Sequence, residues 1–416
     1  MTKHSSSESV SVVPLAFDVA DRLSRIDQAK LRGYRLERLR AELRARDYMG
    51  CLLTDPINIR YATGSRNMQV WTMHSPGRWA FVPTEGAVVL FEFTSSMHVN
   101  EGIETIAELR PTIPWFYFLA GPRCEEKATL WAKEIAALVE KHGGKNRRLA
   151  VDRCEPMGAF KLAAMGIELF DAQEAIELAR AIKSPEEIAA IRLAMDVCDA
   201  SIRRMREALR PGVTENQLWA VMNDVNIAHD GEWIECRLLT SGARTNPWFQ
   251  ECGNKIIEPG EIVAFDTDMV GPLGYLADIS RSWVCPGKRP TNDQRRLYGL
   301  AQEQVIHNIS LLKPGVGFRE FAEKCWPVPE EFTSNRYMMM VHGCGLVDEF
   351  PSIAYARDFA DWGYDGEFRE NMVVSVESYI GEVGAKEGIK LEQQVIVTAK
   401  GAVPLSKTPF EDALVV

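Results

Sequence analysis

The chain has 416 residues, of which 46% are hydrophobic and 25% charged, as expected of a globular protein with a substantial core and about two to three domains. Its 48 basic and 58 acidic residues give a formal net charge of −10, and no block of lysine and arginine is available to follow a phosphate backbone, so a nucleic-acid partner is not expected. No stretch approaches about 18 uninterrupted apolar residues, so a membrane span is not expected either.

The N-terminal segment, residues 1–20, is rich in serine and predicts a flexible arm. It has one lysine and no apolar run of about seven residues, so it does not resemble a secretory signal. The nine cysteines of the chain are odd in number and irregularly spaced, which fits reduced thiols better than a disulfide framework. We therefore expect a cytoplasmic protein.

Residues 21–180 are predicted to form an α/β domain. Within it, residues 27–47 have leucines at helical spacing among many charges and predict a surface helix. The segments 51–65 and 80–93 predict short strands joined by turn residues, and residues 127–144 predict a helix ended by a Gly-Gly pair. Strand and helix thus alternate along this part of the chain.

A second domain is predicted for residues 181–416, and it begins with the clearest helix signal of the sequence. Ser184 is placed to cap this helix, Pro185 occupies the first helical position, Glu186 lies in the first turn, and Gly212 follows the end.

This second domain carries a faint internal repeat. Two pairs of segments resemble each other: LRPGVTENQL (209–218) with LKPGVGFREF (312–321), and PGEIVAFDTD (259–268) with ENMVVSVESY (370–379). The alignment pairs Asp266 with Glu377, and two related halves that face each other would place both acids around one cleft. The alternative is a chance likeness between two Pro-Gly turns.

Five acids and one histidine of the second domain indicate a metal site. They are Asp266, Asp268, Asp278, His342, Glu377 and Glu392. Several of these acids lie in apolar strand contexts, where an unpaired buried charge is very costly. Two divalent cations about 3.5 to 4 Å apart would neutralise them, with the histidine completing one coordination sphere. The alternative is that some of the acids lie at the surface or pair with Arg281 and Lys390.

Four segments that contain these residues resemble the pita-bread-fold metallopeptidases, the group of methionine aminopeptidase, prolidase and creatinase. The segments are FDTDMVGPLGYLADISRS, VHGCGL, MVVSVES and GIKLEQQVIVT. LLTDPINIRYATG and IKSPEEIAAIRLA are similar to the N-terminal domain and connecting helix of the prolidase and creatinase branch. The resemblance implies a creatinase/prolidase-like α/β domain, a C-terminal pita-bread domain with a pseudo-twofold repeat, and a homodimer.

Carried over residue by residue, the resemblance makes Asp278 and Glu392 the carboxylates that bridge two metals and places His342 and Glu377 on one of them. The other metal takes the first aspartate. This chain departs from the family there, because the family's spacing between its two aspartates falls between that of Asp266 and that of Asp268 to Asp278. The internal repeat favours Asp266, and coordination by both remains open.

A peptidase of this group needs two further histidines, and both are replaced. Trp248 and Asp348 stand at their positions, and Ser378 stands where a proline usually follows the first glutamate. A binding module that had lost its chemistry, or a metal-free creatinase-like enzyme, would be expected to lose ligands as well, yet all six candidate ligands are present. A Xaa-Pro dipeptidase-like enzyme with an altered proton relay is the main alternative to changed chemistry on retained metals.

This pattern of substitutions is similar to the dimethylsulfoniopropionate lyases built on the same fold. The resemblance implies a small onium carboxylate as substrate and its β-elimination to acrylate and dimethyl sulfide. Asp348, six residues beyond His342 and not a ligand, is the candidate general base. The resemblance also places Tyr337 in the substrate pocket, as a second candidate catalytic residue. Iron is favoured by the resemblance, although zinc, manganese and cobalt also suit oxygen-rich sites.

The faces of Tyr337 and Trp248 are candidates to hold the sulfonium cation, because aromatic rings attract soft cations. For Trp248, simple core packing is an equally good interpretation. For Asp348, the alternative is a helix cap or a surface acid next to Glu349.

Overall fold

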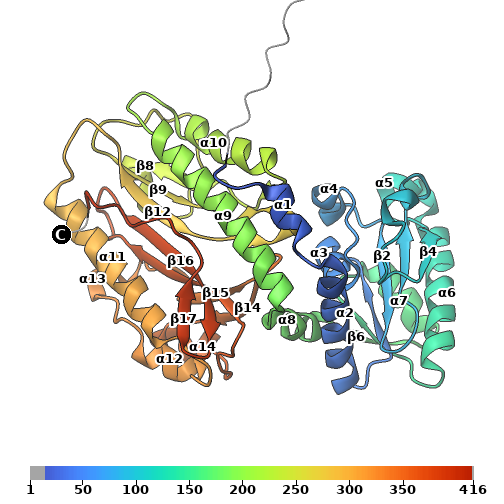
Figure 1. The fold of residues 1–416 in the computed structure, drawn as a ribbon. Helices are drawn as coiled ribbons and strands as arrows, with labels where there is room; N and C mark the ends of the chain where they lie inside the picture. Colours follow the sequence, from blue (N-terminus) through green and yellow to red (C-terminus); the bar gives the residue numbers. More distant parts are fainter. Residues whose placement is uncertain (1–14, 415–416) are drawn as a thin grey trace, which may run out of the picture. The chain divides into compact units, whose positions relative to one another are not determined.

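The computed structural model describes residues 15–414, which divide into two compact units (Figure 1). One unit is Asp27–Glu186, and the other combines residues 15–26 with residues 187–414 of the described chain. Residues 1–14, most of the expected N-terminal arm, lie outside the described residues. Among residues 15–414, none of the helices combines the length and the apolar character needed to cross a membrane.

The N-terminal unit is built on a six-stranded sheet with the order β4-β3-β2-β1-β5-β6. Its strands are β1 (Gly50–Leu53), β2 (Trp79–Pro83), β3 (Val89–Glu92), β4 (Glu108–Pro111), β5 (Arg148–Val151) and β6 (Glu168–Asp171). Its helices are α2 (Gln28–Ala45), α3 (Pro56–Thr63), α4 (Gln69–His74), α5 (Tyr117–Ala120), α6 (Cys124–Gly143), α7 (Pro156–Ala164) and α8 (Gln173–Ala181), with 3-10 turns η1 (Thr94–Asn100) and η2 (Gly121–Arg123). Trp79 and Phe81 of the sheet pack against Trp131 and Ile135 of α6 to form its core.

The expected strand over residues 51–65 is only partly present. The strand ends at Leu53, and α3 follows it. Asp55 accepts hydrogen bonds from the backbone N–H groups of Ile57 and Asn58, and Pro56 occupies the first turn, so the local sequence carries a complete helix start. These capping groups outweigh the strand-like alternation of apolar residues.

The C-terminal unit contains three sheets, with the orders β11-β10-β7, β12-β9-β8 and β14-β13-β15-β16-β17. Its strands are β7 (Trp233–Ile234), β8 (Leu239–Ser241), β9 (Ile262–Asp266), β10 (Met269–Val270), β11 (Leu276–Ala277), β12 (Ser280–Val284), β13 (Val341–Cys344), β14 (Asp348–Ile353), β15 (Val373–Ile380), β16 (Ile389–Thr398) and β17 (Gly401–Pro404). Its helices are α1 (Val19–Ser24), α9 (Pro185–Ala208), α10 (Glu215–Ala228), α11 (Asn292–Leu311), α12 (Phe318–Lys324), α13 (Glu330–Thr333) and α14 (Phe359–Trp362), with 3-10 turns η3 (Gly242–Thr245), η4 (Pro272–Gly274) and η5 (Ala356–Asp358).

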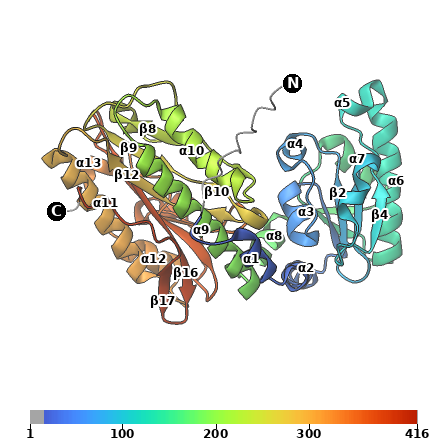
Figure 2. The ribbon, with the colours of Figure 1, turned by 45° about the horizontal axis from the view of Figure 1, so that its top comes forward.

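The internal repeat is visible as two helix–turn–helix–strand arrangements. In Figures 1 and 2, α10 lies beside β8, and α11 lies against β15 and β16. Gly212 and Gly315 occupy the two Pro-Gly turns, both with positive φ, which glycine adopts without strain. Each glycine donates its N–H to a carbonyl nine residues before the paired acid, Gly212 to Ile257 and Gly315 to Phe368. Asp266 and Glu377 therefore occupy equivalent positions in the two halves of the repeat.

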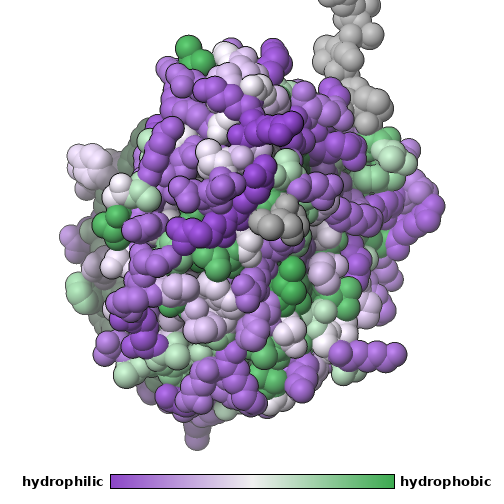
Figure 3. All heavy atoms as spheres, turned by 90° about the vertical axis from the view of Figure 1, so that its left-hand side faces the viewer, coloured by the Kyte–Doolittle hydropathy of each residue, from purple (hydrophilic) through white to green (hydrophobic). Residues whose placement is uncertain are grey.

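Two of the sheets of this unit are joined through polar side chains rather than through a shared strand ladder. The Ser282 hydroxyl donates to the Lys390 carbonyl and accepts from the Lys390 N–H, which ties β12 to β16. Figure 3 shows one face of the molecule, on which hydrophilic side chains predominate and hydrophobic ones are scattered. The interior of this unit, where β9, β12, β13, β15 and β16 come together, contains the predicted metal ligands of these strands.

Candidate active site

The structure brings the six predicted ligands together inside the C-terminal unit. Three overlapping groups have ligand atoms within 4.8 Å of one another, and two of them, His342 with Glu377 and Glu392, and Asp266 with Asp268 and Asp278, account for all six. The third group joins Asp278 to His342. These residues come from β9, β13, β15, β16, the β9–β10 connection, which holds Asp268, and the β11–β12 connection, which holds Asp278.

Strand register places these side chains opposite one another. Glu377 of β15 is the direct partner of Glu392 on β16, so their side chains project from the same face of the sheet. Asp266 is likewise paired with Ser280 of β12, whose hydroxyl lies 2.8 Å from an Asp266 oxygen and 2.7 Å from a Glu392 oxygen. Ser280 therefore links acids from two different sheets.

The Nε2 atom of His342 faces three carboxylates. It lies 3.4 Å from Asp278 Oδ2, 3.4 Å from Glu377 Oε1 and 3.6 Å from Glu392 Oε1. Ligands at about 2.0 to 2.2 Å in a tetrahedron are separated by roughly 3.3 to 3.5 Å, so this spacing suits atoms grouped around one ion. Asp278 Oδ1 and Glu392 Oε1 are buried and have no hydrogen-bond partner among the described residues. The residues present fit a divalent metal ion.

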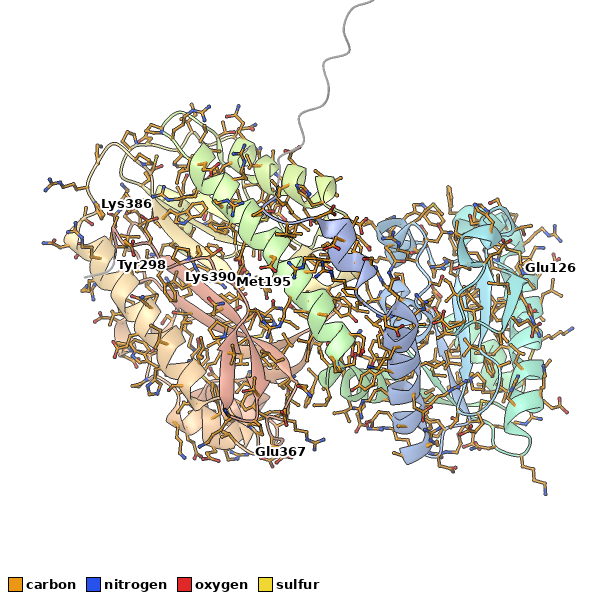
Figure 4. The ribbon with its side chains drawn as sticks, viewed as in Figure 1. Glu126, Met195, Tyr298, Glu367, Lys386 and Lys390 are labelled. Atoms are coloured by element: carbon orange, nitrogen blue, oxygen red, sulfur yellow. The ribbon has the colours of Figure 1, made fainter. Side chains whose placement is uncertain are left out.

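Lys390 supplies the cation that the acids contact in this structure. Its Nζ lies 2.5 Å from Glu377 Oε2, 3.1 Å from Asp266 Oδ2 and 3.3 Å from Glu392 Oε2, and the residue is fully buried. Figure 4 labels Lys390 within the interior of the unit. Pairing of some acids with Lys390, left open by the sequence, is therefore observed. Arg281 instead donates to backbone carbonyls, that of Glu392 among them.

The two oxygens of Glu377 and Glu392 are used differently. In each residue Oε2 faces Lys390, and Oε1 faces His342. The Lys390 ammonium therefore holds the two carboxylates through their Oε2 atoms and leaves their Oε1 atoms available to a metal.

Burial among like charges governs the protonation of the acids. Burial is the largest cause that raises the pKa values of Asp266, Asp278 and Glu377, and it raises that of Asp268 to about 7. For Glu392, burial is opposed by Lys390 and His342, which hold its pKa well below the usual range. In the absence of metal, the cluster therefore retains protons that a metal must displace.

Asp348 lies at the edge of this cluster as the first residue of β14. Its Oδ1 is 3.3 Å from Nδ1 of His342, and its side chain is 63% exposed. It begins a strand, so of the two alternative interpretations the helix cap does not apply. Although the side chain is exposed, the protein atoms around the carboxyl group reduce its hydration and raise its pKa, an effect that His342 opposes and Glu392 supports.

The two predicted aromatic residues lie in different surroundings. Trp248 is 7% exposed and packs with Tyr379 in the hydrophobic core, which favours the core-packing interpretation. The ring of Tyr337 is only partly buried, with the Lys390 Nζ 4.4 Å from its centroid. Phe249, which is 53% exposed, stacks on Tyr337 at 5.2 Å. An aromatic group thus extends from the buried ammonium to the surface.

The sequence reasoning did not assign roles to three residues beside the site: Ser280, Cys344 and Phe249. A signal was available for Cys344, which is two residues from His342 and therefore shares its strand face. The same two-residue period of a strand places the side chains of Lys390 and Glu392 on one face of β16. The contact of Phe249 with Tyr337 joins residues far apart in the chain, and local spacing carries no signal for it.

Two family models match the chain. The model of metallopeptidase family M24 matches residues 189–399, and that of the creatinase/prolidase N-terminal domain matches residues 35–182. The described fold agrees with this: an α/β N-terminal unit precedes a pita-bread unit with an internal repeat.

Two curated relatives extend over nearly the whole chain. Dimethylsulfoniopropionate lyase DddP from Roseovarius nubinhibens is 41% identical over 393 residues, which cover 93% of this chain and 88% of the relative. The protein of the same name from Roseobacter denitrificans is 39% identical, with coverage of 94% and 89%. Among solved structures, a Xaa-Pro dipeptidase from Bacillus anthracis has a TM-score of 0.72 at 20% identity and covers 91% of this chain and 99% of its own.

Proposed function

The chain belongs to metallopeptidase family M24 and is a carbon–sulfur lyase of the dimethylsulfoniopropionate lyase DddP family, and on this premise we propose that it cleaves dimethylsulfoniopropionate to acrylate and dimethyl sulfide by β-elimination, with Asp348 as the general base. The position of Asp348 carries the mechanism. It contacts His342, yet its side chain is 63% exposed, whereas the acids that face His342 Nε2 are at most 2% exposed.

The cluster would hold two divalent ions through Asp266, Asp268, Asp278, His342, Glu377 and Glu392. When bound, such ions supply positive charge to the substrate carboxylate and to the charge that develops at the α carbon. Iron as the metal, a homodimer and a cytoplasmic location belong to the same proposal. The oxygen-rich donor set with one histidine supports a borderline ion such as iron.

In the proposed reaction the Asp348 carboxylate accepts the proton from the α carbon. The electrons of that C–H bond form the double bond of acrylate, and the bond from the β carbon to sulfur breaks with its electron pair leaving on neutral dimethyl sulfide. The raised pKa of Asp348 supports this role, because it makes the carboxylate a stronger base than an ordinary aspartate.

The sulfonium group would lie near the aromatic residues. We assign Tyr337 to the substrate pocket because its ring is only partly buried and, with the exposed Phe249 stacked on it, forms an aromatic surface of the kind that attracts cations. Because Trp248 is buried in the core, we assign it a packing role next to the pocket instead of a direct contact with the sulfonium.

The test is headspace gas chromatography of dimethyl sulfide from the purified full chain, with its metal content measured, given dimethylsulfoniopropionate. Release that stops on chelation and returns with added metal is expected. Asp348→Asn should lower the turnover number by about 10²- to 10⁴-fold, the usual contribution of a general base, with unchanged metal content. Asp361→Asn, at an exposed acid of α14, is the matched control.

A Xaa-Pro dipeptidase-like activity with an altered proton relay is the second candidate, supported by the likeness in fold to a dipeptidase. A Gly-Pro or Ala-Pro dipeptide is therefore assayed in parallel. Dipeptide cleavage without dimethyl sulfide would overturn the lyase proposal. Equal loss of metal and activity in Asp348→Asn would make Asp348 a residue that positions His342 instead of the base.

A further inference from the structure

The imidazole of His342 has a second edge that the carboxylate centre does not use. On that edge, Nδ1 lies 3.2 Å from the Gly343 carbonyl oxygen, 3.3 Å from Asp348 Oδ1 and 3.7 Å from Cys344 Sγ, so a metal there would displace the contact with the carbonyl. Cys344 Sγ in turn lies 4.0 Å from Asp278 Oδ2. One ligand atom from each of these four residues lies within 4.8 Å of the others when either nitrogen of His342 is counted, and Asp278 Oδ2 lies 3.4 Å from Nε2.

The hairpin of β13 and β14 fixes three of these four groups. His342 and Cys344 are two residues apart on β13, so their side chains point to the same face. Cys344 is the direct cross-strand partner of Asp348 on β14, which places the thiol and the carboxylate side by side. The arrangement is thus a property of the backbone register.

Three of the separations between the donor atoms are close to those of a tetrahedral thiolate site. With a Zn–S distance of about 2.3 Å and Zn–N and Zn–O distances of about 2.0 to 2.2 Å, tetrahedral ligands lie about 3.6 Å apart for sulfur to nitrogen or oxygen and about 3.3 Å apart for nitrogen to oxygen. The observed separations are 3.7, 4.0 and 3.3 Å. In addition, Asp278, whose Oδ2 is the atom nearest to the thiol, is only 1% exposed, so a cation at this position would be shielded from water.

We propose that Cys344, His342 Nδ1, Asp278 and Asp348 form a second cation site that takes a thiophilic divalent ion such as Zn²⁺ or Cd²⁺, and that its occupation inhibits the enzyme. On binding, the Cys344 thiol releases its proton to solvent, and the histidine carries its remaining proton on Nε2. A neutral imidazole has one nitrogen lone pair to offer, so His342 serves one centre at a time. An ion in the thiolate site also occupies Asp278, which is then lost to the carboxylate centre, and Asp348, which can then no longer act as the general base.

The donor sets of the two sites select different ions. The carboxylate centre offers oxygen atoms and one imidazole, which suit iron and manganese, whereas a thiolate favours softer ions. The identity of the bound metal therefore decides whether Asp348 is free to act as a base.

The first test is cobalt titration of the chelator-treated full chain, followed by absorption spectroscopy. Thiolate ligation gives a near-ultraviolet sulfur-to-cobalt charge-transfer band, which carboxylate and imidazole ligands do not produce. The band is expected in the unchanged chain and absent from Cys344→Ser and Cys344→Ala, while the visible bands of the carboxylate centre remain. Two variants are used so that a folded one, judged by its thermal unfolding, is available.

Cys236→Ala is the matched control, because its thiol is also near the acids but donates to the Asp266 carbonyl, 3.9 Å away, instead of facing His342. The band should persist in this variant. A band missing from the unchanged chain, retained in the Cys344 variants, or lost in Cys236→Ala would each overturn the site.

The second test measures inhibition of the manganese- or iron-loaded enzyme by added Zn²⁺ or Cd²⁺. The concentration for half inhibition, relative to each variant's own activity, should rise at least about tenfold in Cys344→Ala, which corresponds to about 1.4 kcal/mol of lost affinity. Unchanged inhibition would contradict the inhibitory role. This arm rests on the proposed lyase function, and the cobalt band does not. A chain that shows the band but releases no dimethyl sulfide would retain the site and refute the function.

Discussion

Lys390 carries a positive charge into a region from which water is excluded, and the acids around it account for its presence there. When ionised, the five predicted carboxylate ligands carry five negative charges. Two divalent ions would supply four positive charges, and the Lys390 ammonium supplies the fifth. Its contacts with Glu377, Asp266 and Glu392 keep the cluster paired both with and without metal. A single buried lysine therefore balances the charge of a site built for two ions.

Replacing Lys390 with methionine should destabilise the metal-free protein by about 3 to 5 kcal/mol, because it leaves buried acids without their counter-charge. The loss should be smaller once metal is bound, since the ions then supply most of the compensation. Urea unfolding before and after metal loading measures the difference, and Lys390→Arg keeps the charge as a control. Equal losses in the two states would mean that the lysine contributes packing instead of charge.

The β13–β14 hairpin is the element on which the site depends most closely. The ladder shifts register between His342 and Gly343, and this irregularity sets the direction in which His342 points. A Cβ atom at Gly343 would lie 2.3 Å from the Phe350 carbonyl oxygen, which is backbone and unable to move aside alone. The close approach of the two strands therefore requires glycine at this position.

We expect Gly343→Ala to cost about 1 to 3 kcal/mol of folding stability, the usual range for overpacking, and to lower metal content because the clash moves His342. Gly299→Ala is the control, since a Cβ there meets no atom within 4 Å and α11 should gain up to about 1 kcal/mol from the helix propensity of alanine. Thermal unfolding with metal analysis gives both values. A variant that unfolds like the parent and binds metal normally would show that the hairpin can open without consequence.

At the scale of the whole molecule, the pH dependence of stability should be dominated by the buried acids when metal is absent. A carboxyl group whose pKa is raised by folding stabilises the folded state while it is protonated. That contribution is complete below the pKa of an unfolded aspartate, about 3.9, and is lost as the pH rises through the folded value. For Asp268 the folded pKa is about 7.

The melting temperature of the chelated protein should therefore fall between about pH 4 and pH 7, with Asp268 contributing no more than about 4 kcal/mol to the loss. Added divalent metal should raise the melting temperature more at the upper end of this range, because protons compete with metal for the same oxygens. Differential scanning calorimetry with and without metal measures both effects. A flat profile, or equal stabilisation by metal at every pH, would mean that the acids are ionised throughout.

Local sequence patterns and the family resemblance were sufficient to predict the family, the two-part fold and the group of acids. The membership of family M24, the likeness to the lyases and the two-part fold are confirmed. Acids in apolar strands pointed to the cluster because burial of a charge demands compensation. The α3 helix was not predicted, although Asp55 followed by Pro56 is a typical helix start.

The interior of the site was harder to predict for a physical reason. Which carboxylate oxygen faces Lys390 and which faces His342 depends on the register of β15 and β16 and on side-chain rotamers. The pairing of Cys344 with Asp348 depends on a bulge in the hairpin. Neither leaves a periodic signal in the sequence.

The predicted metal ligands and Asp348, the residue assigned as general base, differ in how deeply they are buried. Asp266, Asp278 and Glu392 are at most 2% exposed within the strand framework, whereas Asp348 is 63% exposed at a strand start. Exchanges at such exposed positions usually change folding stability by no more than about 0.5 kcal/mol. In evolutionary terms, a substitution at an exposed position such as Asp348 can change the chemistry of the site while the buried metal ligands stay in place. The protein can then remain folded at that step of a change from one reaction to another.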